Sequence, residues 1–304
     1  MNSFNRVNFR AASYRVATLL TGLALVYGPG AWAFAISFLA SQYTASNFAT
    51  IGVNTNAIAL DAGLNLYVQD QSASGADFSI LEFTAASGYS SSSVFSSYPR
   101  DSSTHLNGLD FDPSGTLFSS ENDAGGNAGT IRNANTGAQT KQLANFRPTG
   151  IDAPGGDVIY FSGRRESQGN FGNIYRLTIS TGVVDTVISS IVSTGVALND
   201  TGDIFVSTKQ TAQPGGYLPN SIYRFDFLGG GAYSTGSLVA TFDENVGELA
   251  FDGAGRLYAM ENNPDNSPGT TSIIQLTVVP APATAALFLL GLAGIARFRP
   301  RAAT

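Results

Sequence analysis

Gly108-Leu109-Asp110-Phe111-Asp112-Pro113-Ser114-Gly115-Thr116-Leu117-Phe118 is one of five similar stretches that decide the fold of this 304-residue chain. It consists of a short apolar strand, a polar turn and a second apolar strand. The turn segment Asp112–Gly115 supplies the Asp, Pro and Gly residues that a tight reversal of the chain requires. The stretch therefore predicts a β-hairpin.

The same pattern recurs at intervals of about 40 to 50 residues, a period typical of propellers and solenoids. Its five copies begin at Ala57, Gly108, Gly150, Gly195 and Glu248. In every copy a large apolar residue is followed eight positions later by another, and the pairs are Ile58 and Leu66, Leu109 and Leu117, Ile151 and Ile159, Val196 and Ile204, and Leu249 and Leu257. Further strands are expected in most units, such as Ser221–Phe225, Val183–Ile188 and Leu238–Phe242.

Four short strands per unit predict an all-β fold, a β-propeller of five or six four-stranded blades over residues 34–279. The last unit ends after its third strand, so we expect a segment near the N-terminus, Phe48–Val53, to complete it and close the ring. A sixth blade within 84–106 or 34–55 is an alternative, and so is a β-sandwich.

The run G-[IL]-x-[FL]-D-x-x-G-x-[LI]-[YF]-V, followed by I-Y-R-[FL] as in Ile222–Phe225, resembles NHL and gluconolactonase-like six-bladed propellers over residues 56–279. The resemblance implies a propeller fold and says little about function. Lactonase-like members of that group hold a metal ion, so the resemblance also implies an alternative function for this chain, that of a divalent-metal-dependent hydrolase.

Residues 1–33 have the pattern of a secretory signal peptide, with a signal helix. Arg6, Arg10 and Arg15 precede the apolar stretch 16–27, and Ala31 and Ala33 provide the small residues that a signal peptidase reads. We expect cleavage after Ala33, or alternatively after Ala35. An uncleaved N-terminal anchor is the other interpretation.

Residues 280–304 predict a sorting and membrane segment that contains an apolar helix. Pro280, Ala281 and Pro282 precede an apolar run, which is followed by Arg297, Arg299 and Arg301. The segment resembles the PEP-CTERM sorting signal of Gram-negative bacteria, in which Glu usually stands at the position of Ala281. The resemblance implies export, transient membrane association, an exosortase-type processing enzyme, and delivery to the cell surface or extracellular matrix. An ordinary membrane tail is the alternative, although the run is shorter than the ~20 residues that span a bilayer.

Charge narrows the range of partners. The chain has 16 basic and 22 acidic residues, and six of the basic ones are the arginines of the two terminal segments, which leaves a body with a net charge near −12. Such a surface repels nucleic acid and favours divalent cations or cation-bridged polymers. With no Cys in the chain, neither disulfides nor thiolate metal sites are available.

Acidic residues near the strand ends are the candidate functional groups. We expect these carboxylates to converge on one face of the ring, and their positions are Asp110, Glu121, Asp152, Glu248 and Glu261. Such oxygens can hold a hard cation such as Ca²⁺. In the other interpretation they accept backbone hydrogen bonds. At the equivalent places in units three and four, Arg164 and Lys209 add positive charge instead.

Nucleophilic catalysis has little support, because His105 is the single histidine of the chain and no catalytic motif is present. We therefore expect an exported binding or structural protein, with extracellular polysaccharide or surface proteins as partners and no established catalytic residue or cofactor. A metal-dependent hydrolase of the lactonase type is the alternative.

Overall fold

The computed structural model describes residues 36–37, 43–70, 77–99, 104–123, 128–165, 172–209, 215–262 and 270–278. The expected signal peptide, residues 1–33, and the expected sorting segment, residues 280–304, lie outside these ranges. The described residues form β-strands, one 3-10 turn at Ala85–Ser87 (η1) and connecting turns. No helix long and apolar enough to cross a membrane occurs among them.

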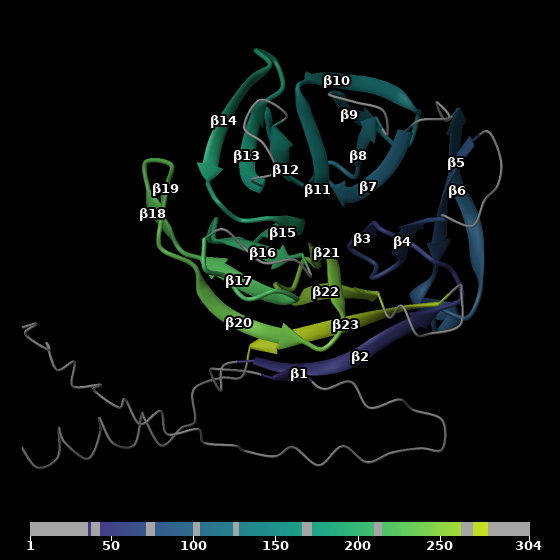
Figure 1. Cartoon of the computed structure of the whole chain (residues 1–304). Helices are drawn as coiled ribbons and strands as arrows, with labels where there is room; N and C mark the ends of the chain where they lie inside the picture. Colours follow the sequence, from purple (N-terminus) through teal and green to yellow (C-terminus); the bar gives the residue numbers. More distant parts are fainter. Residues whose placement is uncertain are drawn as a thin grey trace, which may run out of the picture. The chain divides into compact units, whose positions relative to one another are not determined.

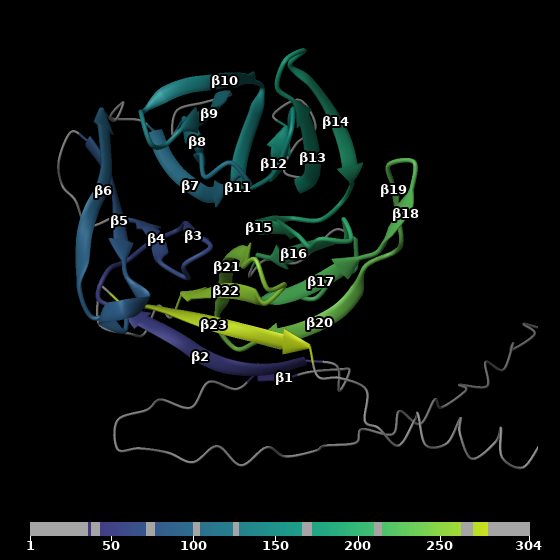
Figure 2. The same ribbon diagram turned by 180° about the vertical axis from the view of Figure 1, so that it is seen from behind.

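The strands form five antiparallel blades (Figures 1 and 2), of four strands each except that a short fifth strand is added to blade four. Blade one contains β3 (Ile58–Leu60), β4 (Leu66–Gln69), β5 (Asp77–Phe83) and β6 (Ser92–Pro99). Blade two contains β7 (Thr104–Phe111), β8 (Leu117–Asp123), β9 (Ala128–Asn133) and β10 (Ala138–Ala144). Blade three contains β11 (Phe146–Gly155), β12 (Val158–Arg165), β13 (Gly172–Thr178) and β14 (Val183–Ile188).

Blades four and five include strands from distant parts of the sequence. Blade four contains β15 (Ser193–Leu198), β16 (Ile204–Thr208), β17 (Ser221–Phe225) and β20 (Ser237–Phe242). A small hairpin, β18 (Phe227–Gly229) and β19 (Ala232–Tyr233), is inserted between β17 and β20. Blade five contains β21 (Asn245–Phe251), β22 (Leu257–Asn262), β23 (Thr271–Val278) and β2 (Tyr43–Ile51).

The N-terminal segment closes the ring. Strand β2 pairs antiparallel with β23, so that Tyr43 lies opposite Val278 and Ile51 lies opposite Thr271. The expected closure of the last unit by the N-terminus is confirmed, although the strand begins earlier than Phe48. Before it, β1 (Ile36–Ser37) adds a fifth strand to blade four by pairing with β20.

The number of blades is five. The stretches considered for a sixth blade instead supply the fourth strands β6 and β2 of blades one and five. The innermost strands β3, β7, β11, β15 and β21 contact one another in cyclic order, with β21 returning to β3. Radial packing of this kind is a propeller and excludes a sandwich of two stacked sheets.

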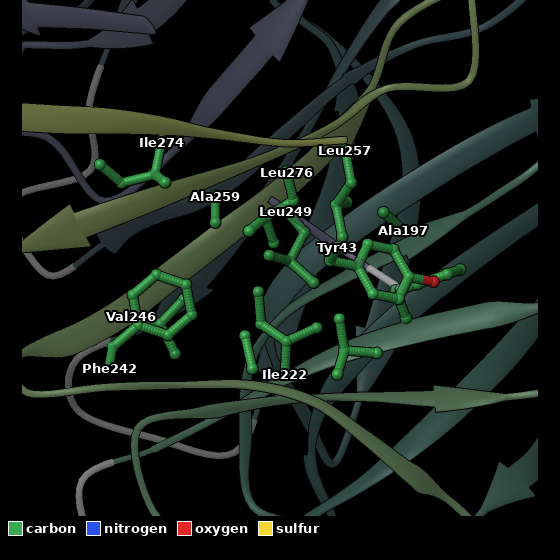
Figure 3. Close-up of a cluster of buried hydrophobic side chains, with 13 residues drawn as sticks. Tyr43, Ala197, Ile222, Phe242, Val246, Leu249, Leu257, Ala259, Ile274 and Leu276 are labelled. Atoms are coloured by element: carbon green, nitrogen blue, oxygen red, sulfur yellow. The ribbon is translucent and has the colours of Figure 1, made fainter. Parts of the chain in front are cut away.

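The hydrophobic core is divided among the interfaces between blades. Five clusters of buried side chains are present, and each joins residues of two neighbouring blades. The cluster of Figure 3 combines Ile222 of blade four with Leu249, Leu257 and Ile274 of blade five. Burying one such side chain contributes about 1.5–3 kcal/mol to folding. Stability therefore depends on neighbouring blades rather than on any blade alone.

Four of the five hairpins use the same turn. The first carboxylate or amide oxygen of the turn residue accepts two backbone N–H groups, those two and four residues later, at Asp61, Asp112, Asn199 and Asp252. These side chains satisfy donors that the reversal leaves without strand partners. Blade three turns instead through Gly155 and Gly156, whose φ angles of 99° and 68° suit glycine.

Candidate functional site

The inner strands meet at a row of glycines near the axis of the ring. A Cβ atom added at Gly108 would lie 2.9 Å from Cα of Gly150, and one at Gly150 would lie 2.8 Å from Cα of Gly195. One at Gly195 would lie 2.7 Å from Cα of Glu248. Blades two to five therefore approach each other more closely than larger residues permit. The glycines that begin units two, three and four are explained by this contact.

Asp110 and Asp152 each stand two positions after one of these glycines, and each connects its blade to the next one. Asp110 Oδ2 in blade two accepts the backbone N–H of Ala153 in blade three at 2.7 Å. Asp152 Oδ2 in blade three accepts the backbone N–H of Leu198 in blade four at 2.7 Å. The same position therefore makes the same hydrogen bond at two successive interfaces. These carboxyl groups act as connections between blades.

Glu248 extends from blade five to blade three, which is not its neighbour in the ring. Its Oε1 accepts the backbone N–H of Ile151 at 3.0 Å. Its Oε2 is buried without a hydrogen-bond partner, and an added Cβ at Gly150 would lie 2.8 Å from it. The side chain thus occupies space that the glycines leave beside the axis.

The three axial carboxyl groups, Asp110, Asp152 and Glu248, hold their protons more tightly than ordinary acids. Burial raises the pKa of Asp110 to about 7, against two opposing backbone hydrogen bonds. Burial, followed by repulsion from Asp110, raises the pKa of Asp152 well above its ordinary value. Burial also raises the pKa of Glu248, and Asp110 and Asp152 add to that effect. The axis therefore disfavours negative charge.

Glu121 and Glu261 belong to second strands and have different surroundings. Glu121 Oε2 accepts Nε–H of Arg132 at 2.9 Å, while burial raises the pKa of the carboxyl group despite this arginine. Burial together with repulsion from Glu244 and Asp243 raises the pKa of Glu261 to about 7. Glu121 therefore belongs to a polar cluster with Arg132, and Glu261 belongs to a separate acidic cluster with Asp243 and Glu244.

The five predicted metal ligands do not converge on one point. Asp110 pairs with Phe118, three residues before Glu121 on β8, a separation of roughly 10 Å along the strand. Across residues 36–278, apart from the ranges not described, no group of three or more His, Asp or Glu side chains can hold a metal ion. The axial carboxyl groups also bond to backbone amides and resist ionisation. The residues present do not fit a Ca²⁺ site of six to eight oxygens.

The five carboxylates are separated because the inner strands begin earlier in the sequence than expected. If Asp110, Asp152 and Glu248 stood at the starts of their strands, they would lie on the same face of the ring as Glu121 and Glu261. Strands β7 and β11 begin six residues before Asp110 and Asp152, and β21 begins three residues before Glu248. The early residues, such as Thr104–Asn107, include polar side chains that mask a strand pattern. Asp110 consequently lies near the turn end of its strand and inside the ring.

A repeated polar contact between blades was not anticipated. Thr149 Oγ1 donates to the carbonyl of Ser193 at 3.0 Å, and Thr194 Oγ1 donates to that of Val246 at 2.7 Å. Asn107 makes the equivalent bond to Pro148 at 3.4 Å. The available signal is the Asn or Thr directly before the glycine of units two to four.

Comparisons with known proteins indicate the fold. No protein-family model matches the chain, and no curated protein matches it. Among solved structures, a carbohydrate-active enzyme of family AA12 from Trichoderma reesei superposes with a TM-score of 0.52 at 10% identity, covering 81% of this chain and 98% of the other.

Two further structures align at lower similarity. A gluconolactonase from Xanthomonas campestris has a TM-score of 0.48 at 17% identity, covering 81% of this chain and 94% of its own. Regucalcin, a calcium-binding protein from Agrobacterium tumefaciens, has a TM-score of 0.41 at 13% identity, covering 76% and 92%. At 10% identity, the likeness to the family AA12 enzyme concerns the fold alone.

Proposed function

We propose that this chain is an exported β-propeller that acts as a binding and structural protein at the surface, or in the extracellular matrix, of a Gram-negative bacterium. In this proposal it associates with exopolysaccharide or with other surface proteins. The observation that carries it is the use of Asp110, Asp152 and Glu248 as acceptors of backbone N–H groups from other blades. Acidic residues that connect blades are consistent with a scaffold.

The same observation weighs against the alternative, a metal-dependent hydrolase of the lactonase type. A catalytic cation needs ionised oxygens that converge on one point. Here burial raises the pKa of Asp110 to about 7 and that of Glu248 well above its ordinary value. Glu121, for its part, is engaged with Arg132. A hydrolase would therefore need a different set of ligands from the one that the sequence suggested.

Export and sorting are supported by the two ends of the sequence. In the proposal, the segment 1–33 directs secretion, and the segment 280–304 holds the chain in the membrane until an exosortase-type enzyme processes it. The body between them has an excess of acidic residues, which disfavours nucleic acid as a partner. Cation-bridged anionic polymers remain compatible with that charge.

The test is fractionation of the bacterium that makes the chain. We expect the intact chain in the envelope and matrix fractions, and a chain lacking residues 280–304 in the culture medium. Ala281→Glu, which restores the carboxylate common in the resembled signal, is expected to increase processing. An intact chain that stays in the cytoplasm would contradict the proposal.

Metal content separates the two functions. We expect the purified chain to contain no stoichiometric Ca²⁺ or Zn²⁺, and its melting temperature to be unchanged when either ion is added. We also expect no hydrolysis of sugar lactones above the rate with Asp110→Asn. A bound metal together with lactone hydrolysis that Asp110→Asn abolishes would favour the enzyme instead.

A further inference from the structure

Strand β1 lies at the outer edge of blade four, next to β20 (Figure 1). The two strands are antiparallel, and Ile36, the first residue of β1, lies opposite Phe242, the last residue of β20. The amino end of β1 is therefore next to the residues that follow Phe242. These are Asp243 and Glu244, which connect β20 to β21 of blade five. The start of the folded chain thus lies beside two acids.

A third acid, Glu261 of β22, is buried close to this pair. It is 2% exposed, and its Oε2 is buried without a hydrogen-bond partner. Burial, and then repulsion from Glu244 and Asp243, raises the pKa of Glu261 to about 7. A buried carboxyl oxygen without a partner is unfavourable, and nearby negative charge adds to the cost. The acidic cluster of Asp243, Glu244 and Glu261 therefore lacks a positively charged donor.

The equivalent glutamate of blade two shows what the cluster lacks. Glu121 and Glu261 are the fifth residues of β8 and β22, and each is 2% exposed. Glu121 accepts Nε–H of Arg132 at 2.9 Å. In the ranges that the structure describes, no Lys or Arg forms an ion pair with any member of the acidic cluster. Blade five therefore has the buried acid without the guanidinium group.

Cleavage of the expected signal peptide creates a positive charge near this place. Hydrolysis of the bond between Ala33 and Phe34 leaves a carboxylate on the released peptide and an α-ammonium group on the chain, two positions before Ile36. Cleavage after Ala35 leaves that group on Ile36 itself. A residue spans at most about 3.6 Å, so either ammonium group is within roughly 7 Å of the start of β1. It can therefore reach the acids that follow β20.

We propose that the acidic cluster of Asp243, Glu244 and Glu261 binds the α-ammonium group that signal-peptide cleavage creates at the mature amino terminus. The inference rests on the proposed function, in which the chain is exported and processed, and it gives that cleavage a structural role. The ammonium group donates charge-assisted hydrogen bonds to the carboxylates. It fixes β1 of blade four to an acid of blade five. The uncleaved precursor has a neutral peptide bond at this place, so the contact forms in the processed chain.

The test is the pKa of the α-amino group in the mature chain, purified from the bacterium that makes it. Sequencing from the amino terminus identifies the first residue. Reductive methylation with ¹³C-formaldehyde keeps the positive charge and labels the amine for titration by NMR. Since an ordinary α-amino group has a pKa of about 7.7–8.0, we expect a value about 1 higher.

Substitutions show which acid is responsible. Glu261→Gln is expected to lower the pKa of the α-amino group by about 1, a tenfold weaker hold on the proton. Glu121→Gln is the matched control, because it removes an equally buried glutamate from blade two, and it should leave this pKa unchanged. If Glu261→Gln alters folding, Asp243→Asn is the second variant, since Asp243 is exposed. Equal values in wild type and both variants of the cluster overturn the inference.

Blocking the amine tests the same contact through stability. The mature chain acetylated at its amino terminus should unfold at a lower temperature than the chain with a free amine. In Glu261→Gln this difference should be largely lost, because the two changes remove the same interaction. A difference of equal size in both backgrounds overturns the inference. A melting temperature that Ca²⁺ raises in wild type, but not in Glu261→Gln, assigns the cluster to a metal ion and overturns it as well.

Two further outcomes separate this inference from the proposed function. A chain at the cell surface that begins at Phe34 and has an α-amino group of ordinary pKa overturns the inference and leaves the proposed export intact. A chain that remains in the cytoplasm with residues 1–33 attached overturns the proposed function. If that chain shows the raised pKa after purified signal peptidase has cut it before Phe34, the acidic cluster stands as the inferred site.

Discussion

Glu248 of blade five accepts the backbone N–H of Ile151 in blade three at 3.0 Å, and so connects two blades that are not neighbours in the ring. Its second carboxyl oxygen is buried without a partner, beside the glycines that bring the inner strands together. With Asp110 and Asp152, it places three acids inside the propeller. The first two predictions follow from this arrangement.

The axial acids should make the protein less stable as the pH rises. The folded chain holds the proton of Asp110 up to about pH 7, whereas the unfolded chain releases it near pH 4. The contribution of Asp110 to the free energy of unfolding should therefore fall between about pH 4 and 7 and level off above. Asp110→Asn removes this contribution and leaves those of Asp152 and Glu248, so at pH 8 the variant should gain up to about 4 kcal/mol over wild type.

Urea denaturation of wild type and Asp110→Asn at pH 4 and pH 8 measures this difference. The control is Asp200→Asn, because Asp200 is exposed in the turn of blade four. If Asp110→Asn shifts stability equally at both pH values, the acid is not the source of the dependence.

Gly150 should tolerate no larger residue. A Cβ there would lie 2.8 Å from Cα of Gly195 and 2.8 Å from Oε2 of Glu248. Gly150→Ala is therefore expected to lower the free energy of unfolding by about 3 kcal/mol or more, because backbone atoms would have to move apart. Gly253→Ala is the control, since nothing lies within 4 Å of its added Cβ. Thermal unfolding that affects both variants alike would show that the close approach is unimportant.

The threonine contacts between blades should contribute measurably to stability. Thr194 Oγ1 donates to the carbonyl of Val246 across the interface of blades four and five. Thr194→Val keeps the shape and removes the donor, so it should cost about 1–2 kcal/mol in chemical denaturation. Thr194→Ser retains the hydroxyl group and should lose clearly less. A serine variant as unstable as the valine variant would assign the effect to the methyl group.

The turn aspartates should be structural. Asp112 Oδ1 accepts the backbone N–H groups of Ser114 and Thr116 at 2.9 and 2.8 Å. Asp112→Ala leaves both without this acceptor and should cost about 1–2 kcal/mol. Asp200→Ala in the turn of blade four removes an exposed carboxylate and should change stability by less than about 0.5 kcal/mol. Comparing the melting temperatures of Asp112→Ala and Asp200→Ala checks whether the hydrogen bonds of the Asp112 side chain stabilise the turn.

The hairpins and the closure of the ring could be predicted because they depend on local residue types. Large apolar residues eight positions apart, with Asp or Gly between them, are sufficient to specify two strands and a turn. The unfinished last unit indicated that the N-terminus supplies β2. The outer strands β6 and β10 were less evident, because their exposed faces carry Ser, Thr and Gln rather than an apolar pattern.

The arrangement of the carboxylates could not be predicted in the same way. Asp110 and Glu121 appear equivalent in sequence, as acids close to apolar strands. Their surroundings depend on strand length and on the register between blades, which no local pattern determines. The pairing of Arg147 with Arg164 likewise depends on the register of β11 and β12. Sequence indicated which residue types were available, and packing determined which of them meet.

The pairing of Tyr43 with Val278 has a consequence for protein engineering. The start of β2 and the end of β23 lie side by side, so a short peptide in place of β1 could join them without distorting either strand. New termini could then be opened at the glycine-rich tip of the β18–β19 hairpin, Gly229–Gly231, where the backbone has positive φ angles and an added Cβ would meet nothing. The resulting circular permutant would make blade five covalently continuous and would transfer the closure of the ring to blade four, whose strands β17 and β20 would then lie near opposite ends of the chain.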